Sequence, residues 1–202
     1  LRRACNREAL SAARAATGVE VISRPVKLGL GEAYRAGMSR ALALGADVIV
    51  TMDADGSHDP CRLPDLLAAT AGADLVIGSR YVPGGGIAAW PLGRRLLSRA
   101  AQCAAGRRLG PIARDMTSGF RAYNSRVLET VPPAAVASNG YSFLIEYAFL
   151  IHRAGFTVTE VPIIFEDRRA GRSKISEREI LRAIGTLIRL RRDREPGRVR
   201  SV

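Results

Sequence analysis

The sequence predicts an α/β fold in which a mostly parallel sheet carries helices on both faces. Segments with helical periodicity alternate with short apolar runs along the chain, which is the order typical of parallel sheets. Two of these runs, 46–52 and 73–79, are almost continuously apolar, as expected of strands that are buried on both faces. The length of 202 residues and the 47% hydrophobic content suit one globular core, so we expect residues 1–202 to form a single domain.

The first half of the chain contributes helices and strands in regular alternation. Gly18 and Pro25 bound the first apolar run, and small or apolar residues at helical spacing indicate the helix that follows it. Asp59 and Pro60 provide an N-cap and a first-turn proline for a later helix. The elements expected here are a helix over 1–16, a strand over 19–23, a helix over 29–44, a strand over 46–52, a helix over 59–67 and a strand over 73–79.

The second half of the chain is less regular. Its glycines and prolines predict a loop over 81–91, and Gly155 marks the end of a helix. Ile180, Ile184 and Leu187 share one face of a further, amphipathic helix. The remaining expected elements are a helix over 92–109, a short strand or turn over 116–123, a helix over 143–154, a strand over 156–165, a polar loop over 167–174, a helix over 176–192 and a basic tail over 193–202.

The composition limits the classes of function. Basic side chains outnumber acidic ones by 31 to 19, a formal net charge of +12 that attracts polyanions; an arginine-rich composition is the alternative explanation, since Lys27 and Lys174 are the only lysines. The aromatic-plus-basic strand motifs of RNA-binding modules do not occur, so we expect no nucleic-acid partner. The best apolar run, 143–151, is too short for a spanning helix and is interrupted by Glu146, and three cysteines do not suggest a disulfide scaffold.

An Asp-x-Asp pair is the strongest chemical signal. Asp53 and Asp55 come directly after the apolar run 46–52, and ligands of open α/β sheets bind at the carboxyl ends of strands. The two carboxylates would repel each other, and a divalent ion with a preference for oxygen, Mg²⁺ or Mn²⁺, would relieve that repulsion. The pair therefore predicts a metal–diphosphate site, while an Asx turn or N-cap pair stays open as the purely structural interpretation.

Six segments give the chain a family resemblance. Its sequence resembles the polyprenol-phosphate (dolichyl-phosphate) mannose synthases, inverting GT-A glycosyltransferases of family 2, through MDADGSHDP, DLVIGSRYVPGG, WPLGRRLLSR, DMTSGFRAY, GYSFLIEY and VPIIFEDRRAGRSK. The resemblance implies a Rossmann-like GT-A nucleotide-diphospho-sugar transferase fold. Members of that family begin with a PTYNE-like strand and a DDGS-like segment, which this sequence lacks. We therefore expect an N-terminally truncated fold without the first nucleotide-binding strands, and we expect it to bind GDP-mannose poorly or not at all.

The resemblance also implies a set of site residues. Asp53 and Asp55 would hold Mg²⁺ or Mn²⁺ on the donor diphosphate. An acceptor-phosphate pocket would be formed by Arg80, Arg94 and Ser98, and a lid over the donor by Arg168, Ser173 and Lys174. Asp115 and Ser118 would shape the sugar pocket, with turn chemistry as the alternative, and Glu146 would touch sugar hydroxyls or pair with an arginine. The residues expected to act catalytically are Asp55, Arg80, Arg94 and Arg168.

The activity that the resemblance implies is transfer of mannose from GDP-mannose to a polyprenyl phosphate, with inversion to the β-linked product. Two alternatives stay open: a polyprenyl-phosphate glucosyltransferase of the same fold, and an inactive, truncated remnant. The expected location is cytoplasmic, peripheral at the inner face of the cell membrane. The helix over 176–192 and the basic tail could lie on anionic lipid, unless the tail is simply solvated.

Overall fold

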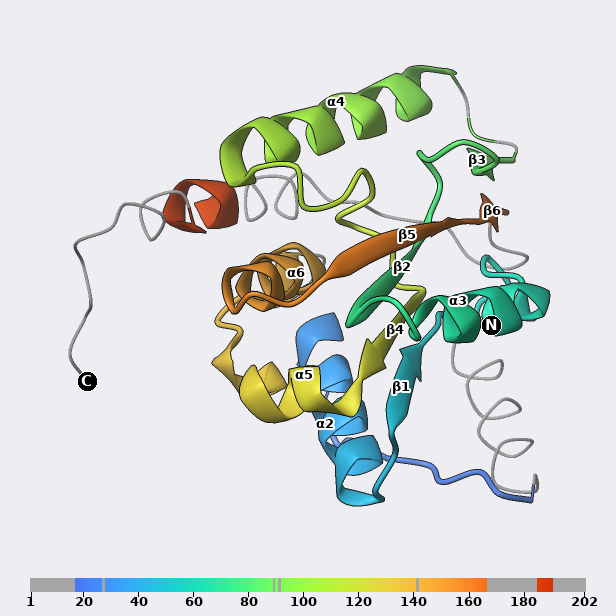
Figure 1. Ribbon diagram of the computed structural model, residues 1–202, viewed down its shortest axis with the longest axis vertical. Coiled ribbons are helices and arrows are strands. Elements are labelled where there is room, and N and C mark those ends of the chain that lie inside the picture. Colours follow the sequence, from blue (N-terminus) through green and yellow to red (C-terminus); the bar gives the residue numbers. More distant parts are fainter. Residues whose placement is uncertain are drawn as a thin grey trace.

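The computed structural model describes residues 17–26, 28–88, 90, 92–140, 142–166 and 185–190, and Figure 1 shows its arrangement. Its main sheet has the strand order β1-β4-β2-β5. Strands β1, β2 and β5 run in the same direction, and β4 runs opposite to them between β1 and β2. The expected α/β fold is confirmed, with one reversed strand in the sheet. The bounds are β1 Val48–Thr51, β2 Leu75–Ser79, β4 Arg121–Asn124 and β5 Val158–Pro162.

Helices pack on both faces of this sheet, as expected (Figure 1). Strand side chains alternate between two cores: Ile49, Leu75 and Tyr123 contribute to the larger one, and Val76 and Ala122 to the smaller. The larger core joins the sheet to α2, α5 and α6, and the smaller one joins it to α3. These helices are α2 Leu30–Ala43, α3 Leu63–Ala69, α5 Ser125–Thr130 and α6 Ser142–Arg153.

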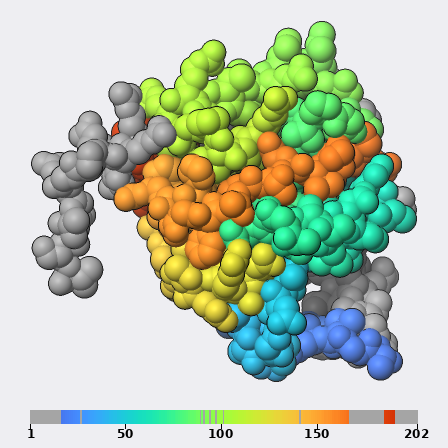
Figure 2. Space-filling model, in the orientation of Figure 1, coloured from blue at the N-terminus to red at the C-terminus, as the bar shows by residue number. Residues whose placement is uncertain are grey.

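Local signals explain where the best-predicted elements begin and end. A 3₁₀ turn, η1 (Pro60–Arg62), precedes α3, and the Asp59 carboxylate accepts a hydrogen bond from the Cys61 backbone N–H at 3.0 Å, as the capping pattern predicts. Helix α4 (Leu92–Leu109) covers the expected range 92–109. In Figure 2 the residues of α4 lie above those of β5 and β6 (Ile164–Phe165). These boundaries depend on residues that are neighbours along the chain, so they can be predicted from the sequence.

Several helices and strands differ from those that the sequence predicts. The strand expected over 19–23 is wrong: this segment is irregular, because no described strand pairs with it and an unpaired extended segment has no ladder to join. The loop 81–91 contains β3 (Gly86–Ile87), which pairs with β6, so the strand expected over 156–165 divides where the chain changes partner from β2 to β3. Within 116–123, only the end belongs to a strand, and α5 and η2 (Pro133–Ala135) were not expected.

Some expectations fall outside the described residues. The helix over 1–16, the polar loop over 167–174 and the basic tail lie there, as does most of the helix expected over 176–192. Residues 185–190 of that helix are described and are helical. Among the described residues, no helix is both long enough and apolar enough to cross a membrane.

Candidate active site

The paired aspartates lie in a tight, irregular turn that follows β1. The Asp55 carboxylate accepts hydrogen bonds from the Ser57 backbone N–H at 3.1 Å and from the Ser57 hydroxyl at 2.5 Å. The Asp53 backbone N–H donates to Nδ1 of His58 at 3.1 Å. Residues 53–58 thus form an Asx-type turn, which means that the structural interpretation of this motif holds alongside any metal-binding role.

His58 is buried beneath this turn. Its ring stacks on Phe120, with centroids 5.3 Å apart, and meets the edge of Phe165 at 5.6 Å. Burial lowers the pKa of His58, although the charges of Asp53 and Asp55 oppose that shift. Since its Nδ1 accepts a backbone hydrogen bond, His58 is neutral and supports the turn.

The turn has the donor chemistry of a magnesium or manganese site. Asp53 and Asp55 are both half-buried, and carboxylate oxygens are the ligands that these ions prefer. Among the described residues there is no group of three or more His, Cys, Asp or Glu side chains that could hold a metal. Mg²⁺ commonly takes one or two carboxylates and completes its shell with phosphate oxygens and water, so two aspartates fit such an ion.

A second irregular segment, 114–119, closely approaches this turn. Gly119 lies opposite Asp53: a Cβ atom at position 119 would come within 2.7 Å of the Tyr34 hydroxyl and 3.4 Å of Asp53 Oδ1. The Gly119 carbonyl accepts a hydrogen bond from the Thr51 hydroxyl at 2.8 Å, which ties the segment to β1. Glycine at 119 therefore leaves room for the Tyr34 hydroxyl and lets the segment pass directly beside the Asp53 carboxylate.

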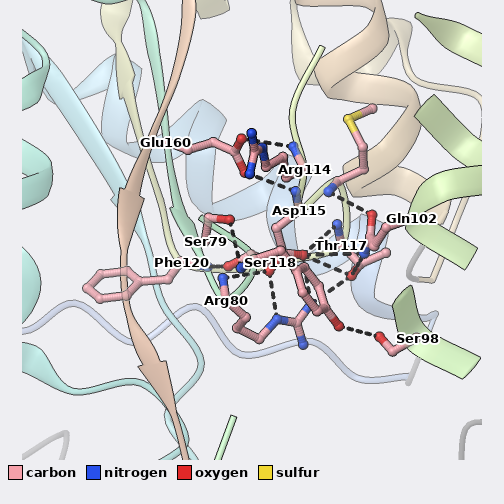
Figure 3. Close-up of polar contacts among 12 residues, drawn as sticks. Ser79, Arg80, Ser98, Gln102, Arg114, Asp115, Thr117, Ser118, Phe120 and Glu160 are labelled. Atoms are coloured by element: carbon pink, nitrogen blue, oxygen red, sulfur yellow. Dashed lines mark hydrogen bonds and ion pairs between the residues drawn. The ribbon is translucent and has the colours of Figure 1, made fainter. Parts of the chain in front are cut away.

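Arg80 and Asp115 form a buried ion pair in the middle of this region (Figure 3). Nε of Arg80 lies 2.7 Å from Asp115 Oδ2, and Nη2 lies 2.7 Å from Oδ1, a bidentate contact. Nη2 also donates to the Thr117 hydroxyl at 2.8 Å. The Arg80 side chain is 8% exposed and that of Asp115 is fully buried. The pair therefore fixes the plane of the guanidinium.

Burial, the partner's charge and nearby aromatic rings all act on the charges of Arg80 and Asp115. Burial alone would raise the pKa of Asp115, but the hydrogen bonds and charge of Arg80 outweigh it and hold that pKa below its usual value. The guanidinium carbon lies 5.3 Å from the Phe165 ring centroid, 5.4 Å from Tyr81 and 5.9 Å from Trp90. Arg80 is therefore a charged, oriented group in an aromatic surround.

Two more side chains hold the segment 114–119 by its backbone N–H groups. Glu160 of β5 accepts from the N–H of Arg114 at 2.8 Å and from that of Asp115 at 2.9 Å. Gln102 of α4 accepts from the N–H of Met116 at 3.0 Å, and its amide donates to the Thr117 hydroxyl at 2.7 Å. Figure 3 shows these side chains converging on the segment from different elements.

Arg121 of β4 holds the carbonyl groups of the same region. It is completely buried, and its guanidinium donates to the carbonyls of Met116 at 2.7 Å, Ser118 at 2.7 Å and Leu144 at 2.9 Å. Because buried backbone carbonyls need hydrogen-bond donors, the arginine stabilises this region. Segment 114–119 is thus irregular in shape but extensively bonded.

The structure brings together several of the residues expected in the site. His58 links the two groups of residues: the Asp53 N–H donates to its Nδ1 at 3.1 Å, and its ring lies 5.6 Å from that of Phe165, which is itself 5.3 Å from the Arg80 guanidinium carbon. Ser118 is buried nearby, where its hydroxyl accepts from the Phe120 N–H at 3.3 Å. This bond is turn chemistry, the alternative that the sequence left open.

Other expected residues lie apart from this cluster or outside the described part. Ser98 is on α4, and its hydroxyl is 2.6 Å from that of Tyr81. Arg94 is one turn earlier on α4; its side chain is outside the described part, as are Arg168, Ser173 and Lys174. Glu146 is buried and accepts from the N–H groups of Ala137 and Ser138 and from Arg189 at 2.5 Å. Its pairing with an arginine is the alternative that the sequence allowed.

Sequence reasoning missed four residues of this region. They are Tyr34, Gln102, Arg121 and Glu160. Arg121 carried a usable signal, since a charged residue between Phe120 and Ala122 in a short strand must find partners inside the protein. Gln102, Glu160 and Tyr34 carried none, because polar residues on a helix, an edge strand or a helix start are ordinarily solvated.

The fold and the aspartate-bearing turn after β1 place the protein among the GT-A glycosyltransferases. Residues 6–131 match glycosyl transferase family 2, and the chain belongs to this family. It is 47% identical over 187 residues to the polyprenol monophosphomannose synthase of Mycolicibacterium smegmatis, covering 90% of this chain and 71% of that protein. The undecaprenyl-phosphate mannosyltransferase of Micrococcus luteus is 46% identical over 158 residues, covering 78% and 65%. The resemblance expected from the six segments is thereby confirmed.

Solved structures agree with the fold. Glucosyl-3-phosphoglycerate synthase from Mycobacterium tuberculosis, in complex with uridine-diphosphate, superimposes with a TM-score of 0.62 at 22% identity, covering 95% of this chain and 66% of that one. The same enzyme in complex with Mg²⁺ and uridine-diphosphate gives a TM-score of 0.56, also at 22% identity. At this level of identity the likeness shows the fold alone. The chain spans about two thirds of the length of these relatives.

Proposed function

We propose that this chain transfers mannose from GDP-mannose to a polyprenyl phosphate, with inversion at the anomeric carbon. The observation that supports the proposal most is that the Asp53–Asp55 turn and the Arg80–Asp115 pair meet at Phe165: the ring of His58, in the turn, lies 5.6 Å from the Phe165 ring, and the Arg80 guanidinium carbon lies 5.3 Å from it. This placement puts oxygen donors for a diphosphate-bound metal beside an oriented cation. The chain's 47% identity to a polyprenol monophosphomannose synthase favours mannose over glucose as the sugar.

The proposed reaction is a direct displacement. An oxygen of the acceptor phosphate attacks the anomeric carbon of mannose, and the bond from that carbon to the diphosphate oxygen breaks on the opposite face. GDP leaves with the electron pair, and an α-linked donor becomes a β-linked product. The acceptor phosphate is already an anion at neutral pH, so the step needs no strong general base. His58 is not required to act as one, because it is buried and its Nδ1 is engaged by the Asp53 N–H.

The residues divide the work by their positions. Asp53 and Asp55 would hold Mg²⁺ or Mn²⁺, which when bound stabilises negative charge on the leaving diphosphate. Arg80, with Arg94 and Ser98, receives the acceptor phosphate; contacts to Asp115 and Thr117 hold its guanidinium in orientation. Arg168, Ser173 and Lys174 close over the donor. Such fixed charges accelerate transfer because they need no reorganisation during the reaction.

The residues expected at the sugar act in this proposal by shaping its pocket. Asp115 and Ser118 are buried within segment 114–119, where their side chains bond to neighbouring groups. They set the backbone path that ends at Gly119, opposite Asp53. Glu146 supports the loop at residues 137–138 from α6. In this proposal, Asp115, Ser118 and Glu146 act on the sugar indirectly, because they fix the backbone that lines its pocket.

We also propose that residues 1–202 work as one domain, peripheral at the cytoplasmic face of the cell membrane, where the polyprenyl phosphate is reached. The formal charge of +12 would favour anionic lipid, since each cation near such a surface adds about 1 kcal/mol. Co-sedimentation with anionic and neutral vesicles tests this part. Equal recovery with both vesicles would contradict it.

The decisive variant for the function is Asp55→Ala. The full chain is supplied with GDP-mannose, undecaprenyl phosphate and Mn²⁺, and the lipid-linked mannose formed is measured. At a saturating concentration of GDP-mannose, which offsets the weak donor binding expected from the sequence, we expect the wild type to form the β-linked product. Asp55→Ala should lose roughly a thousandfold in rate, because charge on the leaving group is no longer neutralised. Asp65→Asn, at an exposed aspartate in an ion pair with Arg62, is the matched control and should keep full activity.

Three outcomes would overturn the proposal. Product from UDP-glucose but not from GDP-mannose would identify the glucosyltransferase alternative. Absence of product with either donor would identify a remnant without activity. Retention of most of the activity in Asp55→Ala would remove the metal role of the aspartate pair.

A further inference from the structure

The side chain of Gln102, on α4, bonds the backbone of segment 114–119. Its amide is buried, with 9% of the residue exposed. Oε1 accepts the Met116 N–H at 3.0 Å, and Nε2 donates to the Thr117 hydroxyl at 2.7 Å and faces Asp115 Oδ1 at 3.4 Å. Both ends of the amide are therefore used on the same short segment (Figure 3).

The position of Gln102 on α4 gives these bonds a consequence for substrate. Arg94, Ser98 and Gln102 follow one another at intervals of four residues, so they lie along one stripe of the helix. Ser98 meets the hydroxyl of Tyr81, the residue after Arg80. The stripe that carries the proposed acceptor residues is thus attached at Gln102 to the segment that orients Arg80.

We propose that Gln102 is a positioning residue. It fixes the rotation of α4 about its axis, and its position along that axis, relative to Asp115–Thr117, and so preorganises the pocket for the acceptor phosphate. This inference rests on the proposed function, which assigns that phosphate to Arg80, Arg94 and Ser98. Arg80 reaches Asp115 and Thr117 from the position directly after β2, and Gln102 reaches the same residues from α4. In the proposed function, Arg94 and Ser98 belong to α4, and Arg80 directly follows β2.

The chemistry of the position explains why an amide is needed. One end must accept a backbone N–H, and the other must donate to a hydroxyl that lies beside a carboxylate. Glutamate at 102 would keep the acceptor, lose the donors and place a negative charge near Asp115. Methionine would fill a similar volume but leave Met116 N–H and the Thr117 hydroxyl with fewer partners. A shift of the helix would relieve either fault.

The test measures acceptor binding and donor binding separately in the full chain. Trp90, the single tryptophan, lies with its ring 5.9 Å from the Arg80 guanidinium, so its fluorescence reports on this pocket. Farnesyl phosphate is the acceptor probe, and GDP with Mn²⁺ is followed by calorimetry. We expect Gln102→Met and Gln102→Glu to raise the Kd for farnesyl phosphate about tenfold, about 1.4 kcal/mol, and to change the Kd for GDP less than twofold.

The controls separate positioning from folding. Cys103→Ser changes an exposed neighbour on the same helix and should leave both affinities unchanged. If Gln102→Met fails to fold, Gln102→Glu, which keeps an acceptor for the Met116 N–H, carries the test with the same expectation. In turnover, the Gln102 variants should raise KM for the acceptor more than they lower kcat.

Each contrary result has a distinct meaning. If the wild type does not bind farnesyl phosphate, the proposed function fails, and this inference fails with it. If the wild type binds and the Gln102 variants bind equally well, only the inference is overturned. A parallel loss of GDP affinity and acceptor affinity would also overturn it, since Gln102 would then support the fold in general.

Discussion

Two irregular segments meet at the candidate site, and they are stabilised in opposite ways. Residues 53–58 bond chiefly to one another: Ser57 donates to Asp55, and Asp53 donates to His58. Residues 114–119 are held by side chains from β1, α4, β4 and β5 and by Arg80, directly after β2, with partners up to 68 residues away in sequence. The first is a local turn, and the second is a product of tertiary structure.

The difference indicates how the two segments divide the work. A local turn places two carboxylates with a geometry that depends on few other residues, which suits a metal site. A segment without helix or strand can hold a defined shape only if outside groups satisfy its backbone. These contributing side chains give segment 114–119 that shape, at the cost of making it sensitive to changes far from it in sequence.

The largest expected effect tests how strongly segment 114–119 depends on outside groups. Arg121→Met leaves the carbonyls of Met116, Ser118 and Leu144 buried without this donor. We expect a loss of about 2 kcal/mol or more in unfolding free energy, because each unsatisfied buried acceptor costs about 1 kcal/mol or more, while the Leu144 carbonyl, inside α6, keeps its helical hydrogen bond. Urea unfolding measures it.

The control for that variant is Arg62→Ala, which breaks an exposed ion pair with Asp65. It should cost no more than about 1 kcal/mol, as surface pairs do. A stability for Arg121→Met within 1 kcal/mol of the wild type would show that the segment holds its shape without the arginine, and the contrast between the two segments would disappear.

The next effect tests the contact between the two segments. Gly119→Ala places a Cβ 2.7 Å from the Tyr34 hydroxyl and 3.4 Å from Asp53 Oδ1. We expect the Kd for GDP with Mn²⁺ to rise about tenfold, about 1.4 kcal/mol, because the new methyl group displaces the Tyr34 hydroxyl and fills the space beside the Asp53 carboxylate. Calorimetric titration measures it.

Two further variants make the Gly119 experiment specific. Adding Tyr34→Phe removes the hydroxyl that the new methyl group meets, so part of the affinity should return. Gly72→Ala, where a Cβ would meet nothing within 4 Å, should behave like the wild type. If Gly72→Ala weakened binding as much as Gly119→Ala, the effect would come from glycine loss in general.

The smallest effect tests the local turn. Ser57→Ala removes the hydroxyl that donates to Asp55 at 2.5 Å but leaves the backbone N–H in place. We expect a cost of about 1 kcal/mol in stability and less than a twofold change in Mn²⁺ affinity. A tenfold loss of Mn²⁺ affinity would instead identify Ser57 as a metal ligand and extend the site beyond the two aspartates.

Much of the fold could be predicted because its signals are local. Helical periodicity and bounding glycines predicted α2, α4 and α6 to within about one residue at each end. Apolar runs predicted β1 and β2. The strand expected over 19–23 failed for the opposite reason. Its five residues carry a strand-like pattern, yet a strand exists only where another strand pairs with it, and pairing depends on distant residues.

The site divides along the same line. By itself, the sequence determined the Asp53–Asp55 motif and offered the turn around it as one interpretation, because residues that are two to five positions apart meet through the covalent chain. The tertiary structure alone decided that Arg80 pairs with Asp115, that Arg121 is buried against backbone carbonyls, and that Gln102 joins α4 to Thr117. Those partners meet only after the sheet and helices have packed, since no short-range rule relates a residue to the groups that folding brings beside it.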